Sequence, residues 1–216
     1  MCRSDVPGLE VDAVVLAGGR ASRLGGADKP ALVVGERSLL ASVTAAAAAA
    51  GARVVVVVGP PRPGLVLTAG RLRVVREDPP GSGPVPALRR GLAEVSAPWV
   101  LVLAADLPFI RAGHLTSLLA AAAGARPAAG AVLADDSGRP QWLAGCWPTA
   151  ALRAASSGYR GGSLRGLLGP LSPVILGPSP GQPGPPAWLD CDTEDDVRRA
   201  RAWSGDPAGP GPGVPQ

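Results

Sequence analysis

The chain has 216 residues, which is enough for one domain with a sizeable buried core, and 46% of them are hydrophobic. Aromatic residues make up only 3%, so this core must be built mainly from alanine, valine and leucine. The net charge of +4 comes from scattered arginines without a basic run or interleaved aromatics, which argues against a nucleic-acid partner.

Runs rich in valine and alanine alternate with glycine and proline clusters along the chain, a pattern typical of parallel strands joined by helices. In chain order we expect strand Asp12–Leu16, helix Ser38–Ala50, strand Arg53–Val58, strand Leu72–Arg76, helix Val85–Val95, strand Trp99–Ala104, helix Ala112–Ala123, strand Ala129–Leu133, strand Trp142–Trp147, helices Thr149–Ser156 and Ser163–Leu168, strand Pro173–Leu176, segment Trp188–Asp192 and helix Glu194–Trp203. Ser38 and Thr193 are the expected N-caps of their helices. We therefore predict a single Rossmann-like α/β domain over residues 11–203, with about seven mainly parallel strands in an open sheet and helices on both faces.

The two ends differ in composition from this domain. Residues 1–10 carry no periodic pattern, and residues 204–216 are rich in proline and glycine, so we expect both to be disordered. Three widely separated cysteines form neither a metal-binding spacing nor an even disulfide set, and no apolar run has membrane-spanning length. We expect a cytoplasmic protein without a membrane partner, either a monomer or a weak homo-oligomer.

The first loop, LAGGRASRLGGADKP at residues 16–30, follows directly from the first expected strand. Its glycines, Gly19 among them, allow backbone amides to approach an oxyanion closely. Arg23 and Lys29 add positive charge within reach of a triphosphate, and Lys29 is the only lysine among the 21 basic residues. Lys29 is followed by proline, so the loop is not a P-loop.

Acidic residues follow two other expected strands. Asp106 ends a buried apolar strand, where a carboxylate is costly unless it binds a cation such as Mg²⁺. Asp78 lies at a comparable strand end and is a candidate contact to ribose or base. Asp190 and Asp192 flank Cys191, and alternation along a strand would direct both carboxylates to one face, which makes either a candidate second metal ligand.

The chain offers few side chains for nucleophilic catalysis. His114 is the only histidine and lies in an apolar helical pattern, so a Ser-His-Asp triad is not expected. Phosphoryl and nucleotidyl transfer need charge neutralisation and positioning rather than an enzyme nucleophile. Because ligands of open α/β sheets bind beyond the carboxyl ends of the strands, the three polar loops favour a nucleotide site at that edge.

Taken in order, these motifs resemble the MobA-like family of nucleotidyltransferases, whose members include the molybdenum cofactor guanylyltransferases. The resemblance covers most of residues 12–203 and rests on LAGGRASRLGGADKP, on Asp78 with its Gly-Pro loop, on VLVLAADLP around Asp106 and on LDCDTEDDVRRA. It departs from the family at residues 83–87, GPVPA in place of GPLAG, and at Asp190 and Asp192 in place of asparagines.

The resemblance implies a magnesium-dependent nucleotidyltransferase domain that transfers GMP from GTP to the terminal phosphate of a molybdopterin-type cofactor and releases pyrophosphate. The residues it implies are Leu16, Ala17 and Gly18 for nucleotide contacts, Lys29 for the phosphates, Asp78 for the nucleoside and Asp106 for Mg²⁺. We expect Lys29, Arg23 and Asp106 to act in catalysis. The alternatives are the same chemistry with CTP, or another nucleotide transfer of this family, and a GTP-binding module without catalysis.

Overall fold

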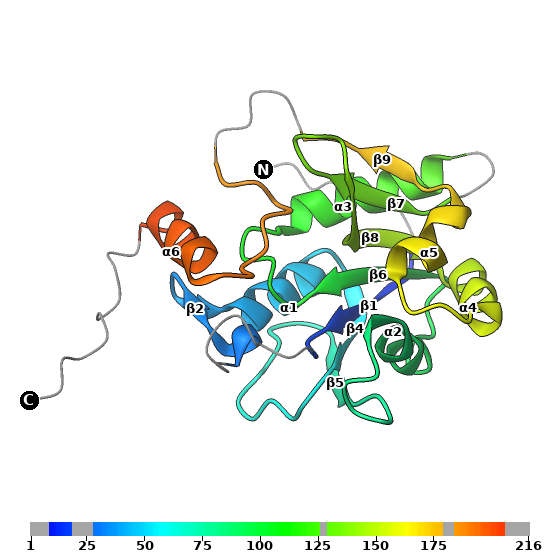
Figure 1. Ribbon diagram of the computed structural model, residues 1–216, viewed down its shortest axis with the longest axis horizontal. Helices are drawn as coiled ribbons and strands as arrows, with labels where there is room; N and C mark the ends of the chain where they lie inside the picture. Colours follow the sequence, from blue (N-terminus) through cyan, green and yellow to red (C-terminus); the bar gives the residue numbers. More distant parts are fainter. Residues whose placement is uncertain (1–8, 19–27, 126–128, 179–183, 206–216) are drawn as a thin grey trace, which may run out of the picture.

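A computed structural model describes residues 9–18, 28–125, 129–178 and 184–205, and a seven-stranded sheet forms the centre of these residues. Along the sheet the strands are β5 (Arg71–Val75), β4 (Ala52–Val58), β1 (Val11–Leu16), β6 (Trp99–Ala104), β8 (Pro140–Pro148), β7 (Ala131–Ala134) and β9 (Val174–Leu176) (Figure 1). Strands β5, β4, β1 and β6 are parallel, and β8 runs antiparallel to β6 and β7. The open, mainly parallel sheet predicted from the sequence is confirmed.

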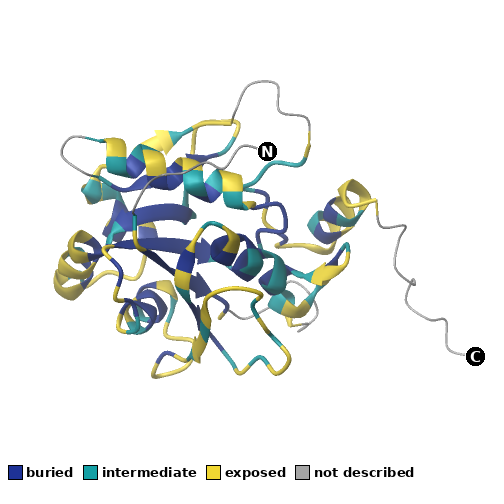
Figure 2. Ribbon diagram, turned by 180° about the vertical axis from the view of Figure 1, so that it is seen from behind, coloured by how far each residue is buried: buried dark blue, intermediate teal, exposed yellow. Residues whose placement is uncertain are grey.

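Helices cover both faces of the sheet, as Figure 1 shows. One face carries α1 (Leu39–Ala49) and α3 (Ala112–Gly124), and the other carries α2 (Pro84–Leu92), α4 (Thr149–Gly158) and α5 (Leu164–Leu168). The central strands appear in Figure 2 as the most deeply buried part of the molecule. In β1, Ala13 and Val15 pack with the first set of helices, whereas Val14 and Leu16 pack with the second. This alternation explains why the strand is apolar throughout.

Most expected elements form close to their expected ends, and both expected N-caps are confirmed. The Ser38 hydroxyl accepts a hydrogen bond from the amide of Ala41 at 3.2 Å, and the Thr193 hydroxyl accepts one from the amide of Asp196 at 3.2 Å. The expected helix from Val85 ends earlier, at Leu92.

Two features differ from the sequence prediction. Residues 33–38, expected to be loop as far as the helix at Ser38, form a hairpin of two short strands, β2 (Val33–Val34) and β3 (Arg37–Ser38), which follows the 3₁₀ turn η1 (Lys29–Ala31). Residues 188–192 form turn and irregular backbone and no strand.

The last helix, α6 (Glu194–Trp203), packs on the β2–β3 hairpin rather than on the sheet, and Figure 1 shows it beside β2. A small apolar cluster joins the two segments. Val34 and Leu39 lie on one side and Leu189, Cys191, Val197 and Ala200 on the other, and Phe109, which follows β6, belongs to the same cluster. The Trp203 ring contacts Phe109 edge to face, with centroids 5.9 Å apart. The chain preceding α6 is thereby brought back to the segment that follows β1.

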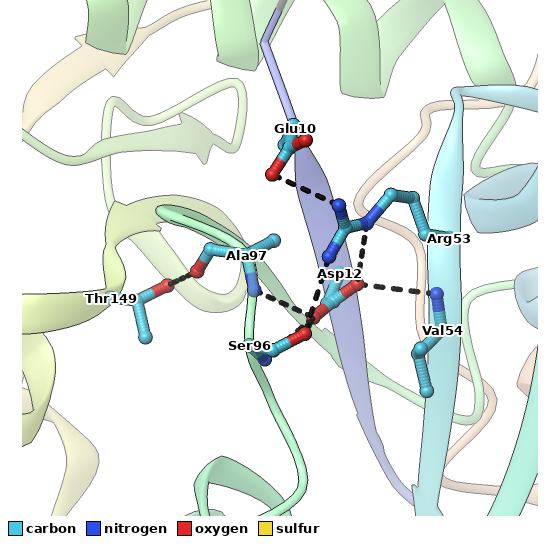
Figure 3. Close-up of polar contacts among 7 residues, drawn as sticks. All are labelled: Glu10, Asp12, Arg53, Val54, Ser96, Ala97 and Thr149. Carbon is cyan, nitrogen blue, oxygen red and sulfur yellow. Dashed lines mark hydrogen bonds and ion pairs between the residues drawn. The ribbon is translucent and has the colours of Figure 1, made fainter.

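A buried carboxylate ties the strands together at the amino-terminal end of β1, opposite the loops discussed below (Figure 3). Asp12 is fully buried and accepts hydrogen bonds from the backbone amides of Ser96 at 2.8 Å, Ala97 at 2.9 Å and Val54 at 3.2 Å. The guanidinium of Arg53 lies 3.8 Å from the same carboxylate. Asp12 therefore links β1 to β4 and to the chain entering β6.

Within the described ranges, no helix has the length and apolar character needed to cross a bilayer. Disorder was predicted for residues 1–10 and 204–216, and all of these except residues 9–10 and 204–205 lie outside those ranges, so it stays a prediction.

Candidate active site

Three segments that are distant in sequence meet at the carboxyl ends of β1 and β6. Lys29 lies in η1, Asp106 follows β6 by two residues, and Asp192 lies in the irregular segment before α6. The Lys29 ammonium forms ion pairs with Asp106 Oδ2 and with Asp192 Oδ1, the latter at 2.5 Å. The side chains of Lys29 and Asp106 are 17% and 20% exposed, whereas that of Asp192 is 52% exposed. Two of the expected catalytic side chains, those of Lys29 and Asp106, are therefore in direct contact.

The position of Lys29 is fixed from both sides of its segment. On one side, the Arg62 guanidinium, from the turn after β4, forms an ion pair with Asp28 and donates a hydrogen bond to the Ala17 carbonyl at 3.4 Å. On the other side, the Leu39 amide donates to the Leu32 carbonyl at 2.9 Å, which closes the hairpin. The loop carrying Lys29 is thus joined to the strand ends it approaches.

The charges around Lys29 are mainly negative. Burial alone would lower the pKa of Lys29, but the Coulomb attraction of Asp106 and the hydrogen bonds to Asp106 and Asp192 outweigh it, so its pKa is raised above the ordinary value. The pKa of Asp190 is also raised, by burial first and then by repulsion from the Asp192 and Asp106 carboxylates. Two carboxylates therefore contact the Lys29 ammonium, and a third, that of Asp190, lies close enough to feel their charge.

Asp190 and Asp192 lie on the same side of their segment even though no strand forms there. Leu189 and Cys191 point into the apolar cluster under α6, so the carboxylates alternate outward between them. Burial, followed by repulsion from Asp106, raises the pKa of the Cys191 thiol to about 12, which keeps it protonated at neutral pH. Cys191 is therefore a packing residue beside the carboxylates rather than a nucleophile.

Buried polar atoms without a hydrogen-bond partner gather around the same edge of the sheet. Among the described residues four such side-chain atoms occur, and three of them follow strands of the parallel half: Arg62 Nε after β4, Glu77 Oε2 after β5 and Asp106 Oδ1 after β6. The fourth, Trp147 Nε1, lies in the core. Buried polar groups in native proteins normally have partners, so three exceptions at neighbouring strand ends indicate a ligand site.

Of the two acidic residues after β5, one is buried and the other is exposed. Glu77 is buried, its Oε1 accepts a hydrogen bond from the Gly81 amide at 2.9 Å, and a Cβ on Gly18 would lie 3.5 Å from that oxygen. Asp78, the residue expected to contact the nucleoside, is exposed. The carboxylate beside the 17–18 turn is therefore that of Glu77, which the sequence interpretation did not select.

The turn at residues 17–18 and the end of β4 are in close contact. The Ala17 amide donates to the Val58 carbonyl at 2.8 Å, and a Cβ on Gly59 would lie 2.8 Å from the Ala17 carbonyl oxygen, so only glycine fits at position 59. A hollow of about 490 Å³ opens beside this contact, between Gly59, Arg62, Val75 and Arg76. The hollow lies at the carboxyl ends of β4 and β5, and the Lys29 ion pairs lie at those of β1 and β6.

Two of the expected site residues, Gly19 and Arg23, fall outside the described residues, and their roles stay predictions. Arg62 and Glu77 are the residues that sequence reasoning missed. Arg62 lies in a turn of glycines and prolines, GPPRPG, that follows a predicted strand. A single positive charge in such a turn is the sequence signal that could have identified it as a site residue. Glu77 directly precedes Asp78, and the sequence held no signal to choose between the two carboxylates.

The carboxylates beside Lys29 are suitable ligands for a divalent cation that is also bound by substrate phosphates. Asp106 and Asp192 supply two carboxylates, and Asp106 Oδ1 is buried without a partner. Across the described part of the chain, no three His, Cys, Asp or Glu side chains are grouped so as to enclose a metal ion by themselves. Mg²⁺ is usually held by one or two carboxylates together with substrate phosphates, which matches this arrangement.

The sheet is open, and a lysine and two acidic residues lie beyond the carboxyl ends of its parallel strands, close to the loop that follows β1. This arrangement is that of a nucleotidyltransferase-type domain. The chain belongs to the MobA-like NTP transferase domain family, whose model matches residues 13–174. A molybdenum cofactor guanylyltransferase from Bradyrhizobium sp. (strain ORS 278) is 37% identical over 150 residues, which are 66% of this chain and 66% of that protein.

Solved structures share the fold. Rv0371C from Mycobacterium tuberculosis H37Rv, crystallised in complex with manganese, superimposes with a TM-score of 0.63 at 22% identity, covering 91% of this chain and 100% of that chain. Molybdopterin-guanine dinucleotide biosynthesis protein A from Archaeoglobus fulgidus superimposes with a TM-score of 0.61 at 16% identity, covering 88% of this chain and 97% of that chain. The predicted fold class and family are confirmed.

Proposed function

We propose that the protein transfers GMP from GTP to the terminal phosphate of the molybdenum–molybdopterin cofactor and releases pyrophosphate, acting in the cytoplasm. The observation that carries this proposal is the Lys29 ammonium held beside Asp106 and Asp192 at the carboxyl ends of parallel strands. It is supported by membership of the MobA-like family and by the guanylyltransferase that is 37% identical.

In the proposed reaction a phosphate oxygen of the acceptor attacks the α-phosphorus of GTP in line. The bond from the α-phosphorus to the bridging oxygen of the β-phosphate breaks, and pyrophosphate leaves with its electron pair. Lys29 and Arg23 neutralise negative charge on the transferred and departing phosphates. Asp106 and Asp192 would hold Mg²⁺, which supplies charge neutralisation at the phosphate oxygens.

The nucleotide is expected to extend along the sheet edge, with its phosphates at Lys29 and its nucleoside toward β5. Three strand spacings of about 4.8 Å separate β6 from β5, roughly 14 Å in all. The 490 Å³ hollow lies at the β5 end of this path. Leu16, Ala17 and Gly18 are proposed to line the path between the two ends.

Glu77 is proposed to bind the base, in addition to the nucleoside contact expected of Asp78. Its Oε2 is a buried acceptor without a partner, and guanine presents two adjacent donors, N1–H and the 2-amino group. Cytosine has no such donor pair on its pairing edge. A carboxylate at this point would therefore favour GTP over CTP.

The test is a pyrophosphate-release assay with Mg²⁺, acceptor cofactor, and GTP or CTP side by side. GTP is expected to support turnover and CTP to support little. Lys29→Ala and Asp106→Ala should remove turnover, whereas Asp195→Asn, an exposed carboxylate of α6, should leave it unchanged. Full turnover by the Lys29 or Asp106 variant would refute the proposed roles, and GTP binding without pyrophosphate release would indicate a binding module.

A further inference from the structure

The Lys29 ammonium lies between two carboxylates and contacts both of them. Its ammonium contacts Oδ2 of Asp106 and Oδ1 of Asp192 at the same time, on side chains contributed by the turn after β6 and by the segment before α6. We call this arrangement the Lys29–Asp106–Asp192 clasp. The clasp joins the first loop of the domain to its last segment.

The same two carboxylates are the ones that fit a divalent cation. A metal ion bound between them would lie against the Lys29 ammonium, and two cations at such a short separation repel each other. The clasp and a metal ion therefore compete for Asp106 and Asp192, and Lys29 must leave before the metal can be held by both.

Removing Lys29 without compensation is also unfavourable. Asp106 and Asp192 would lose their shared counter-ion, and two neighbouring carboxylates would be left without a positive partner. A nucleoside triphosphate changes this balance, because its phosphates attract the Lys29 ammonium while the metal that accompanies them replaces it between the carboxylates.

Resting on the proposed function, we propose that Lys29 is the resident counter-ion of the Asp106–Asp192 pair, and that a divalent cation enters this pair only together with a nucleoside triphosphate that takes up the ammonium. The metal-free protein thus keeps its carboxylates paired. Free metal binds weakly, and nucleotide and metal binding are coupled through Lys29.

The first test measures Mn²⁺ binding to the full chain without nucleotide, from the electron paramagnetic resonance signal of free Mn²⁺. Lys29→Met is expected to bind Mn²⁺ about tenfold more tightly than the wild type or more, within the usual range of coupling between sites. Arg165→Met, which removes an exposed charge from α5, is the matched control and should bind like the wild type. Adding Asp106→Asn to Lys29→Met should abolish the gain.

The second test uses the wild type alone, so it holds even if Lys29→Met folds poorly. Lys29 is the only lysine, and ¹⁵N-lysine labelling therefore gives a single side-chain Nζ resonance. Mg²⁺ alone should leave this resonance in place, whereas Mg²⁺ with a GTP analogue that has a non-cleavable α–β bridge should move it.

Equal Mn²⁺ affinity of wild type and Lys29→Met, or a Nζ resonance that moves with Mg²⁺ alone, would overturn the inference. Neither result concerns pyrophosphate release by the wild type. The proposed transferase reaction therefore remains supported even if the inference about the clasp is refuted. If GTP and acceptor give no pyrophosphate, the proposed reaction fails while the Mn²⁺ titrations still report on the clasp.

Discussion

Asp12 lies in β1 and Asp106 follows β6, so the two aspartates are at opposite ends of the sheet. We expect substitution of Asp12 to reduce stability and substitution of Asp106 to reduce activity. Asp12→Asn removes a carboxylate that accepts three backbone amides, those of Val54, Ser96 and Ala97. The side chain is fully buried, so water cannot replace the lost acceptor. We expect this substitution to destabilise the fold without altering the chemistry.

The size of the effect follows from the hydrogen bonds. An asparagine has one acceptor oxygen, and its amide nitrogen must face either Val54 N–H on one side or the amides of Ser96 and Ala97 on the other. A hydrogen bond to a charged group contributes about 1.5–3 kcal/mol, and a buried unpaired donor costs about 1–3 kcal/mol. Together these give a loss of about 3–5 kcal/mol, or roughly 6–20 °C in Tm for a domain of this size.

Thermal and urea unfolding followed by circular dichroism measure this loss, and pyrophosphate release at 15 °C measures activity. Arg53→Met is the matched control, because Arg53 is largely exposed and its guanidinium lies 3.8 Å from Asp12; it should cost under about 1 kcal/mol. A variant Asp12→Asn within about 1 kcal/mol of the wild type, with an unchanged urea m-value, would refute the account of the network in Figure 3.

Three further outcomes are expected at the candidate active site. Asp106→Asn should lower pyrophosphate release at least about 100-fold while changing Tm by only a few degrees, measured on the same samples; a parallel loss of stability and activity would contradict a catalytic role. Glu77→Gln should lower kcat/KM for GTP and raise the ratio of xanthosine triphosphate to GTP turnover, because the new amide donates where the carboxylate accepted; an equal loss with both nucleotides would mean that Glu77 only orders the Gly81 turn. Asp190→Asn should stabilise the nucleotide-free protein at pH 7 by up to about 1 kcal/mol, since burial and repulsion from Asp192 and Asp106 raise the pKa of Asp190 above 3.8 in the folded state. That gain should be complete above the raised pKa and vanish below pH 3.8, as urea unfolding at pH 3 and pH 7 will show.

The sheet was predictable because its strands carry strong local signals. Five consecutive valines in β4 and the apolar run of β6 require burial on both faces, and β6 has the predicted ends. The caps at Ser38 and Thr193 were also readable, because a side chain that accepts from an amide three residues later is a local arrangement. Local signals of this kind determine where helices and strands form, but they do not determine which elements pack together.

The hairpin at residues 33–38 escaped prediction for the same reason. Its strands have two residues each, too few for a periodic pattern to appear, and the hairpin is stabilised by packing of α6 against Val34. Likewise, the segment at residues 188–192 keeps an alternation of buried and exposed side chains without pairing to any strand. The alternation was correctly predicted, although it occurs here without a strand.

The arrangement of the site residues was predicted in part. Lys29 and Asp106 were identified from residue type and position, and the structure brings them together. The contact between Lys29 and Asp192 joins residues 163 positions apart, and it depends on the apolar cluster that docks α6 onto the hairpin. Nothing local to Asp190 or Asp192 indicates which of them reaches the lysine, so only the tertiary fold makes that choice.

The choice of lysine at position 29 follows from the geometry of the clasp. All the other basic residues of the chain are arginines, so composition alone would place an arginine here. A guanidinium is planar and grips one carboxylate through two parallel hydrogen bonds, whereas an ammonium is compact and directs three donors to separate acceptors. The Lys29 ammonium contacts two carboxylates from different segments and has a third donor for a phosphate. In the proposed clasp the ammonium first contacts two carboxylates and then moves to a polyphosphate. The compact charge of lysine suits this movement better than the planar guanidinium of arginine.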